Sequence, residues 1–573
     1  MRRVQKMIRQ VLAAIVAASI AGPLVAETAS GAYLAGRHAA VRSDYAEAAR
    51  YYTEALARDT KNPELMESAA LSYLSLGRIE RSVPLARQME ASGQNSHVAH
   101  LILTSHLAAE EDFDAILARE TGTAGIGPWV DGLVKAWAYL GTGDVTKSLA
   151  AFDTLSEEPG IKGFVMYHKA LALASVGDFE GAEAIFASDA AGAAAQTRRG
   201  AISFARILAQ LGKFDEAVRL INASFPGGTD PELDALIAGF EAGDLAPFDQ
   251  VRDARDGIAE VLFTFAAVLR SESAGDYYVL LYSRAARFIR PDHVDALLLT
   301  ANLLENLGQY DLAIAEYKAI AADNPAYHAA ELGRAGALRR SDRLDQAVEV
   351  LEQLARSHGE LAVVHSTLGD VLRSEDDFAG AIAAYDRAIE RVAPQAQVSW
   401  VLYYSRGIAF ERSGDIIRAE EDFRAALELN PEQPQVLNYL GYSLVEEQRN
   451  LDEALDMIER AVKASPDSGY IVDSLGWVFY RLGRYEEAVV QMEKAVQLLP
   501  VDPVVNDHLG DVYWAVGRDR EAEFQWRRAL SFIDPDAIDG EADPERIRRK
   551  IEVGLDVVLE QEGAAPLKVA NDG

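Results

Sequence analysis

The sequence predicts an all-α protein, an α-solenoid of about fourteen helix-turn-helix repeats that stack into a superhelix. Three observations lead to this prediction. Small residues recur at intervals close to 34 residues, glycines recur in the short turns between expected helices, and prolines follow the second helix of several units. The 573 residues are 49% hydrophobic, which provides enough apolar side chains for a folded core.

The first 26 residues have the organisation of an export signal. Four basic residues precede an apolar run at 11–21 and a Gly-Pro break, and Leu24-Val25-Ala26 offers a cleavage site. We therefore expect a periplasmic protein whose mature chain begins near Glu27. The apolar run is about half as long as a bilayer span, and an uncleaved membrane anchor is the alternative.

Composition excludes several classes of function. The chain has no cysteine, which excludes disulfides, thiolate metal sites and the acylated N-terminal residue of a lipoprotein. Its formal net charge of −33 repels phosphate backbones, so we expect no nucleic-acid partner. No segment of the mature chain approaches the ~18 consecutive apolar residues of a transmembrane helix.

Residues 27–221 are predicted to form an N-terminal array of repeats. A small or apolar residue returns every 32 to 35 residues in the second helices, and turn glycines keep the same register. We expect two helices of about 12 to 14 residues in each unit, packed closely where side chains are small. The recurring residues are Ala48, Ser82, Ile116, Ser148, Ala182 and Ala217, and the turn glycines are Gly77, Gly143, Gly177 and Gly212.

Residues 222–290 interrupt this rhythm. The part up to 258 lacks the repeat marks and contains a Pro-Gly-Gly sequence, which predicts an irregular joint. The part from 259 to 290 has the pattern of a degenerate repeat with lengthened helices.

Residues 291–535 are predicted to form the C-terminal array. Prolines at 431, 466 and 500 should end second helices, and large residues such as Phe423 and Trp526 should fill the space between neighbouring units. The small residues of the second helices recur every 34 to 38 positions, at Ala313, Ala347, Ala381, Ala419, Ala454, Ala488 and Ala522. Those of the first helices are Gly369, Gly407, Gly441, Gly476 and Gly510.

The last segment, 536–573, is expected to hold a capping helix and a disordered tail. Asp543-Pro544 resembles a helix start, and the helix that follows would shield the open end of the stack. Four basic residues on it are predicted to face solvent, with docking of an acidic partner or lipid headgroup as the alternative. They are Arg546, Arg548, Arg549 and Lys550.

The pattern of marker residues in one unit resembles the tetratricopeptide repeat. The family pattern has Leu-Gly, an aromatic residue, Ala and a closing Pro, and Met492 stands where the family has a second aromatic residue. The resemblance extends over about residues 31–535. Its markers in this unit are Leu475, Gly476, Phe479, Ala488 and Pro500.

This resemblance implies that the first helix of each unit lines a concave wall that binds proteins or peptides. Six of ten wall positions in the C-terminal units are aromatic, against 8% of the whole chain, which favours a recognition surface. The alternative is that neighbouring helices bury several of these rings. The family's carboxylate clamp uses Lys, Asn and Arg at such positions, where this chain has Tyr, Asp and Trp, so we expect no such clamp. The ten positions are Tyr404, Asn438, Tyr442, Tyr470, Asp473, Trp477, Tyr480, Asp507, Asp511 and Trp514.

Residues 435–530 are also similar to exported proteobacterial repeat proteins of the LbcA-like group. The similarity rests on NYLGYSL, GYIVDSLGWVFYRLGRYEEA and NDHLGDVYWAVGRDREAEFQWRRAL. It implies a partner such as a periplasmic protease or a cell-wall hydrolase. This chain departs from the lipoprotein members because it has no cysteine.

No motif for catalysis, a cofactor or a metal ion is present. The chain lacks a phosphate-binding glycine loop, His-Glu-x-x-His and Gly-x-Ser-x-Gly; His508 is interpreted as structural, and the acidic segment 534–540 as a linker. We expect a non-catalytic interaction scaffold or adaptor in the bacterial envelope. The alternatives are a cytoplasmic regulatory repeat protein and an enzyme with an unrecognised site in 222–290.

Overall fold

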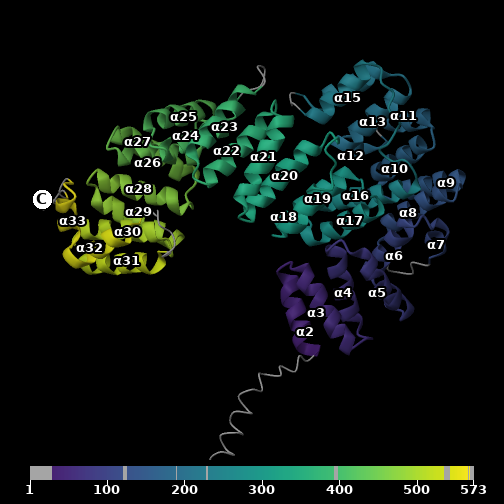
Figure 1. The fold of residues 1–573 in the computed structure, drawn as a ribbon, viewed down its shortest axis with the longest axis horizontal. Coiled ribbons are helices and arrows are strands. Elements are labelled where there is room, and N and C mark those ends of the chain that lie inside the picture. Colours follow the sequence, from purple (N-terminus) through teal and green to yellow (C-terminus); the bar gives the residue numbers. More distant parts are fainter. Residues whose placement is uncertain are drawn as a thin grey trace, which may run out of the picture. The chain divides into compact units, whose positions relative to one another are not determined.

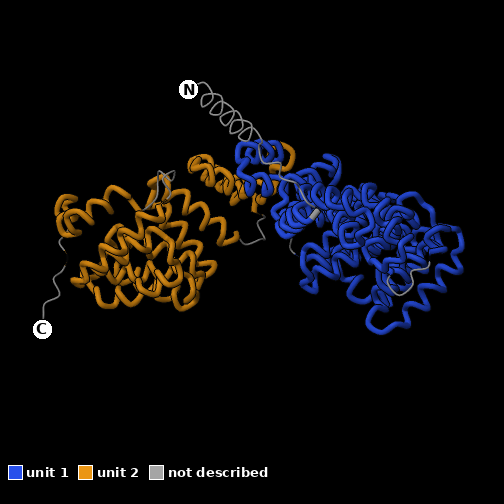
Figure 2. The backbone as a smooth tube through the Cα atoms, turned by 90° about the horizontal axis from the view of Figure 1, so that it is seen from below, with its two compact units in different colours: residues 1–354 blue, residues 355–573 orange. Residues whose placement is uncertain are grey.

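The computed structural model describes residues 29–119, 125–188, 190–226, 230–392, 398–533, 542–564 and 567. Within these ranges the chain folds into 32 helices and no strand, which confirms the all-α fold class. The chain divides into two compact units, residues 1–354 and 355–573 (Figure 2). This division lies inside the predicted C-terminal array, and each unit is described by itself.

The first unit contains the helices labelled α2 to α21, most of which form antiparallel pairs joined by short turns (Figure 1). Their bounds are α2 Ala29–Val41, α3 Tyr45–Arg58, α4 Pro63–Ser75, α5 Ile79–Ala91, α6 His97–Ala109, α7 Phe113–Ala118, α8 Pro128–Gly141, α9 Val145–Ser156, α10 Lys162–Ser175, α11 Phe179–Ala187, α12 Gly192–Ala195, α13 Arg198–Gln210, α14 Phe214–Ser224, α15 Pro231–Glu241, α16 Ala254–Ser271, α17 Asp276–Ile289, α18 Val294–Asn306, α19 Tyr310–Tyr317, α20 Tyr327–Arg340 and α21 Leu344–Ser357.

The second unit continues the same pairing from α22 to α31 and ends with two short helices. Their bounds are α22 Ala362–Ser374, α23 Phe378–Glu390, α24 Trp400–Arg412, α25 Ile416–Leu429, α26 Pro434–Glu446, α27 Leu451–Ala464, α28 Gly469–Arg481, α29 Tyr485–Leu498, α30 Pro503–Ala515, α31 Asp519–Phe532, α32 Pro544–Val553 and α33 Leu555–Gln561.

The recurring glycines of the first helices permit close approach of the second helices. At each of five such glycines in the second unit, a Cβ atom would lie 2.4 to 2.8 Å from a side chain of the partner helix. Real Cβ atoms essentially never make contacts that short, so a larger residue would force the partner side chain to move. The facing pairs are Gly369 with Tyr385, Gly407 with Phe423, Gly441 with Ile458, Gly476 with Met492 and Gly510 with Trp526.

These pairs correct the expected position of the large residues. Trp526 packs inside its own unit, where its indole N–H also donates to Asp511 at 2.9 Å. Phe423 packs against Gly407 of its own unit and reaches Tyr439 of the next, with ring centroids 5.7 Å apart. Large side chains therefore fill the space within units as well as between them.

In the first unit, α16 and α17 cover the first helices of the N-terminal pairs. The helix α16 packs against α8 and α10, and α17 packs against α4 and α6 (Figure 1). A Cβ on Gly257 of α16 would lie 2.2 Å from the Trp137 ring, and Arg284 of α17 donates to the Ser75 carbonyl at 3.0 Å. The segment after the irregular joint thus folds back onto the inner side of the N-terminal pairs.

The C-terminal helices α32 and α33 close the stack of the second unit. Asp543 caps α32 by accepting the backbone N–H groups of Glu545 and Arg546. The single helix that the sequence indicates is divided at Gly554, whose φ of +85° ends α32.

Lys550 does not face solvent, which corrects the prediction for the basic cluster. Its side chain is fully buried, and Nζ lies 2.7 to 2.9 Å from both carboxylates of Asp507 and Asp511. The side chains of Arg548 and Arg549 remain about half exposed, at 55% and 48%. Lys550 therefore lies on the inner face of α32, and Arg548 and Arg549 lie on its outer face.

Within the described ranges, no helix has both the length and the apolar character needed to cross a bilayer. The predicted export signal and the acidic segment 534–540 lie outside the described residues.

Replacing Gly333 by Ala should destabilise the protein, whereas replacing Gly336 on the same helix should not. A Cβ at Gly333 would lie 2.4 Å from the Tyr317 ring, but at Gly336 its nearest neighbour is the Arg340 guanidinium at 3.7 Å. We expect Gly333→Ala to lower the free energy of unfolding by about 1 to 3 kcal/mol. Gly336→Ala should raise it by up to about 1 kcal/mol. Urea unfolding followed by circular dichroism checks both values, and equal effects would contradict the packing argument.

Replacing Lys550 by Met should detach α32 from the stack. The substitution leaves two buried carboxylates without their cation, which costs about 3 to 5 kcal/mol. Hydrogen exchange of residues 544–561 should accelerate strongly. Arg548→Met removes one charge from the exposed face of the same helix and should change exchange little. Equal exchange in the two variants would show that Lys550 does not hold the helix.

Candidate partner-binding site

The ten wall positions do not form one exposed surface. Five are buried: Asp473, Trp477, Tyr480, Asp507 and Asp511. Five keep some exposure: Tyr404, Asn438, Tyr442, Tyr470 and Trp514. Among these, Tyr470 is the most open, with 61% of its surface exposed.

The side chain of Trp477 is buried against neighbouring residues of the wall. Its ring stacks on Tyr480 at 4.8 Å and on His508 at 4.1 Å, and its indole N–H donates to Glu446 at 2.6 Å. Only 9% of Trp477 remains exposed. This tryptophan therefore stabilises the contact between successive first helices.

His508 has the structural role that the sequence indicates. Burial disfavours the charged imidazolium, but Asp473 and two neighbouring aspartates outweigh burial and raise the pKa of His508 to about 9. The charged ring donates from Nδ1 to Asp473 Oδ2 at 2.9 Å while its face stacks on Trp477. A group that stays protonated at neutral pH is a poor general base.

The C-terminal helices cover the last part of the wall. Lys550 occupies Asp507 and Asp511, and the indole N–H of Trp514 donates to Asp556 of α33 at 3.1 Å. Gly554 lies so close to Trp514 that a Cβ there would be 2.6 Å from the ring. The apolar end of an open stack must be shielded from water, and α32 and α33 provide this shield.

Some of the wall positions line one cavity of about 590 Å³ in the second unit. Four predicted residues line it: Asn438 and Tyr442 from α26, and Tyr470 and Asp473 from α28. The helices α24 and α30 contribute the neighbouring walls. The other lining residues are Glu411, Arg412, Tyr439, Ser474, Asp502, Val504 and Val505.

Two hydrogen-bond acceptors of this cavity lack partners. Oδ1 of Asp473 and Oδ1 of Asn438 are buried, and within the described residues neither accepts a hydrogen bond. The other carboxylate oxygen of Asp473 is bound to His508. Unsatisfied buried acceptors are costly, so the cavity favours a ligand that brings donors.

Tyr439 and Asp502 line the cavity but are absent from the predicted set. Asp502 lies in the loop before α30, where it caps the helix by accepting the Val505 N–H at 3.0 Å. A rule based on first-helix positions does not reach this loop, although its Asp-Pro sequence marks a helix start. Tyr439 is one residue beyond a wall position, and its ring lies 5.7 Å from that of Tyr404.

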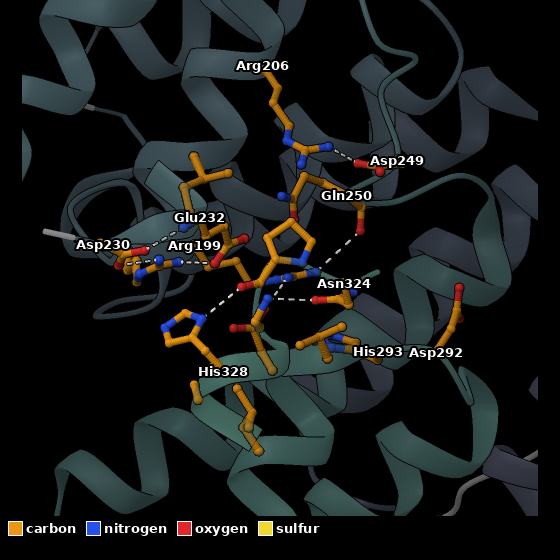
Figure 3. Close-up of a pocket in the computed structure, with 18 of the residues that line it drawn as sticks. Arg199, Arg206, Asp230, Glu232, Asp249, Gln250, Asp292, His293, Asn324 and His328 are labelled. Carbon is orange, nitrogen blue, oxygen red and sulfur yellow. Dashed lines mark hydrogen bonds and ion pairs between the residues drawn. The ribbon is translucent and has the colours of Figure 1, made fainter. Parts of the chain in front are cut away.

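A second cavity, of about 510 Å³, lies in the first unit where the irregular joint meets α13, α18 and α20 (Figure 3). Its lining is dominated by charged side chains, including Arg199, Arg206, Asp230 and Glu232, which Figure 3 labels. It contains part of the segment 222–290, in which a hidden enzyme site is the alternative hypothesis.

The charges of this second cavity neutralise one another. Arg198 pairs with Asp230 at 2.6 Å and with Glu232 at 2.8 Å. Arg206 pairs with Asp249, as Figure 3 shows. The guanidinium groups are therefore committed to neighbours of the same chain.

Glu260 holds the helices behind this cavity together. It accepts from Tyr167 of α10 at 3.0 Å and from Arg199 of α13 at 2.7 to 2.9 Å. His293 accepts the Ala296 N–H through Nδ1, so its Nε2–H donates to Glu260 at 3.3 Å.

The charges of this network depend on its buried neighbours. Burial opposes ionisation of Glu260, but Arg199 and His293 hold its pKa well below the usual range. Burial and Arg199 lower the pKa of His293. Both ring nitrogens of His293 and both carboxylate oxygens of Glu260 are engaged by neighbours, so the network joins α10, α13, α16 and α18. In the described part of the chain, no group of three or more His, Asp or Glu side chains is arranged to hold a metal ion.

Comparisons with known proteins agree with the helical pairs described above. A tetratricopeptide-repeat family model matches residues 33–97, 281–328, 298–362, 404–469 and 446–503. The TPR repeat-containing protein PA4667 of Pseudomonas aeruginosa is 26% identical over 173 residues. That alignment covers 30% of this chain and 28% of the relative, so the chain matches less than a third of the relative's length.

Among solved structures, the Cut9–Hcn1 hetero-tetramer of the APC/C aligns with 89% of this chain and 94% of that chain, at 14% identity and a TM-score of 0.37. A tetratricopeptide repeat protein from Parabacteroides merdae aligns with 45% of this chain and 97% of that chain, at 16% identity and a TM-score of 0.36. MamA from Desulfovibrio magneticus aligns with 30% and 94%, at 20% identity and a TM-score of 0.27.

The matched segments 404–469 and 446–503 include Asn438, Tyr442, Tyr470 and Asp473 of the first cavity. This chain therefore contains tetratricopeptide repeats, and they supply the side chains of its candidate partner-binding site.

Proposed function

We propose that this protein is a non-catalytic scaffold or adaptor that binds a protein or peptide segment in the cavity of its second unit. The observation that carries the proposal is the convergence of Tyr442, Tyr470, Asn438 and Asp473 from two successive first helices on one cavity. It combines exposed aromatic surface with acceptors that have no partner among the residues the structure describes.

The chemistry of the cavity suits a polypeptide. Tyrosine side chains bury a large area at a small cost in conformational entropy, and they are frequent among residues that dominate binding energy. Val504 adds apolar surface, while the acceptors of Asp473 and Asn438 select for donors. The second cavity lacks these properties because its charged groups are paired with each other.

We further propose that the protein acts in the bacterial envelope, as an adaptor for a periplasmic protease or in envelope assembly. The support is the export signal of residues 1–26 and the similarity of residues 435–530 to exported repeat proteins. A cytoplasmic regulatory role is the alternative, and it requires that the first 26 residues are retained.

A photocrosslinking amino acid at position 470 should capture the partner in living cells. Tyr470 is 61% exposed and lines the cavity, whereas Tyr278, on α17 of the first unit, is 63% exposed and does not line it. Benzoylphenylalanine at 470 should give a discrete protein adduct that mass spectrometry identifies. The same residue at 278 is the matched control, and identical adducts at both positions would contradict the proposed site.

Mass spectrometry of the mature protein should place its N-terminus near Glu27 in a periplasmic fraction. Removal of the signal follows from the basic start, the apolar run and the small residues before this position. An intact Met1 in the cytoplasmic fraction would contradict the envelope assignment but not the binding site.

A further inference from the structure

We infer that the cavity of the second unit recognises a lysine side chain of its partner, bound between Asp473 and Asn438. The inference rests on the proposed function, because it names the chemistry that the partner presents. It goes beyond that function by assigning one residue type to one pair of acceptors.

A lysine side chain of this protein is bound by aspartates at the equivalent place in the next repeat. Asp473 in α28 and Asp507 in α30 lie 34 residues apart, at the same position of successive first helices. Asp507 binds Nζ of Lys550 at 2.9 Å, with Asp511 as the second acceptor at 2.7 Å. The aromatic face of Trp526 lies 5.9 Å from the same ammonium group.

The cavity shares two features with this site, a buried carboxylate at the equivalent position and neighbouring aromatic rings, although His508 already pairs with one oxygen of Asp473. Asp473 is 6% exposed and keeps one carboxylate oxygen without a partner in the described residues. Asn438 contributes a second unsatisfied acceptor, and Tyr442 and Tyr470 line the same space with aromatic rings. An ammonium group brings three donors and also interacts favourably with aromatic faces.

The charges around the cavity favour a cation over an anion. Three carboxylates line it, those of Glu411, Asp473 and Asp502, against the single guanidinium of Arg412. The charged His508 balances Asp473 from behind but occupies only its Oδ2. A phosphate or carboxylate ligand would meet net repulsion in this setting.

The geometry also distinguishes lysine from arginine. An arginine binds a carboxylate best through two parallel hydrogen bonds to both oxygens. His508 already engages one oxygen of Asp473, so this bidentate contact is blocked. A compact ammonium group needs only the remaining oxygen and the amide oxygen of Asn438.

The experiment uses the full chain and an array of peptides that are acetylated at the N-terminus only, so that the lysine ammonium group stays charged. One central position is Lys, Arg, Met or Glu, and the other positions are randomised. We expect binding of the Lys set to exceed that of the Met set by about tenfold, as one charge-assisted hydrogen bond provides. The Arg set should bind less well than the Lys set, and the Glu set should bind least.

Variants assign this preference to the two acceptors. Asp473→Asn should abolish the preference for Lys over Met. Asp456→Asn on α27 is the control and should leave the preference unchanged, because it removes the same charge from an exposed side chain outside the cavity. Asn438→Asp should increase the preference for Lys, since two carboxylates bind Lys550 at the neighbouring repeat. If Asp473→Asn fails to fold, the gain expected for Asn438→Asp decides the question.

The outcomes separate this inference from the proposed function. Peptide binding without a preference for Lys, or a preference that persists in Asp473→Asn, would overturn the lysine assignment and leave the scaffold role intact. Absence of binding by any peptide set, together with absence of the adduct at position 470, would overturn the scaffold role itself.

Discussion

The close approach of two helix backbones inside each repeat is the constraint on which the rest of the second unit depends. At Gly407, Gly476 and Gly510 the neighbouring side chain leaves room for a hydrogen atom and nothing larger. This contact fixes the spacing and rotation of each first helix. Because the spacing repeats, side chains from α26 and α28 reach the same cavity, and Asp473 and Asp507 occupy equivalent places.

A stack of repeats exposes an inner wall and two end faces. Helices of this chain cover part of the wall in each unit and the C-terminal end of the second unit. In the first unit, α16 and α17 lie on the first helices of the N-terminal pairs. In the second unit, α32 and α33 cover Trp514, and Lys550 neutralises Asp507 and Asp511. The cavity at Asn438 and Asp473 is the part of the predicted surface that combines exposed tyrosine with unsatisfied acceptors.

The sequence predicts the helical pairs well because their causes are local: small residues at close contacts, positive-φ glycines in turns and prolines after second helices. The candidate site is predicted only in part, since Tyr470 and Asn438 lie on the cavity while Trp477 is buried. Its burial depends on His508, a neighbour in space from the next repeat, and on stacking that periodicity does not encode. Lys550 illustrates the same limit, because its position in a basic run favours solvent while its partners lie 39 and 43 residues away.

The position of Lys550 limits on which side of Asp473 a bound polypeptide can extend. Since α32 fills the place one repeat beyond Asp473, a polypeptide seated at Asp473 meets an occupied neighbour on that side. On the proposed binding mode, the ligand continues toward α26, where Tyr442 also lines the cavity. A longer ligand would therefore gain affinity from residues on one flank of its anchoring position, and extension on the opposite flank would add nothing.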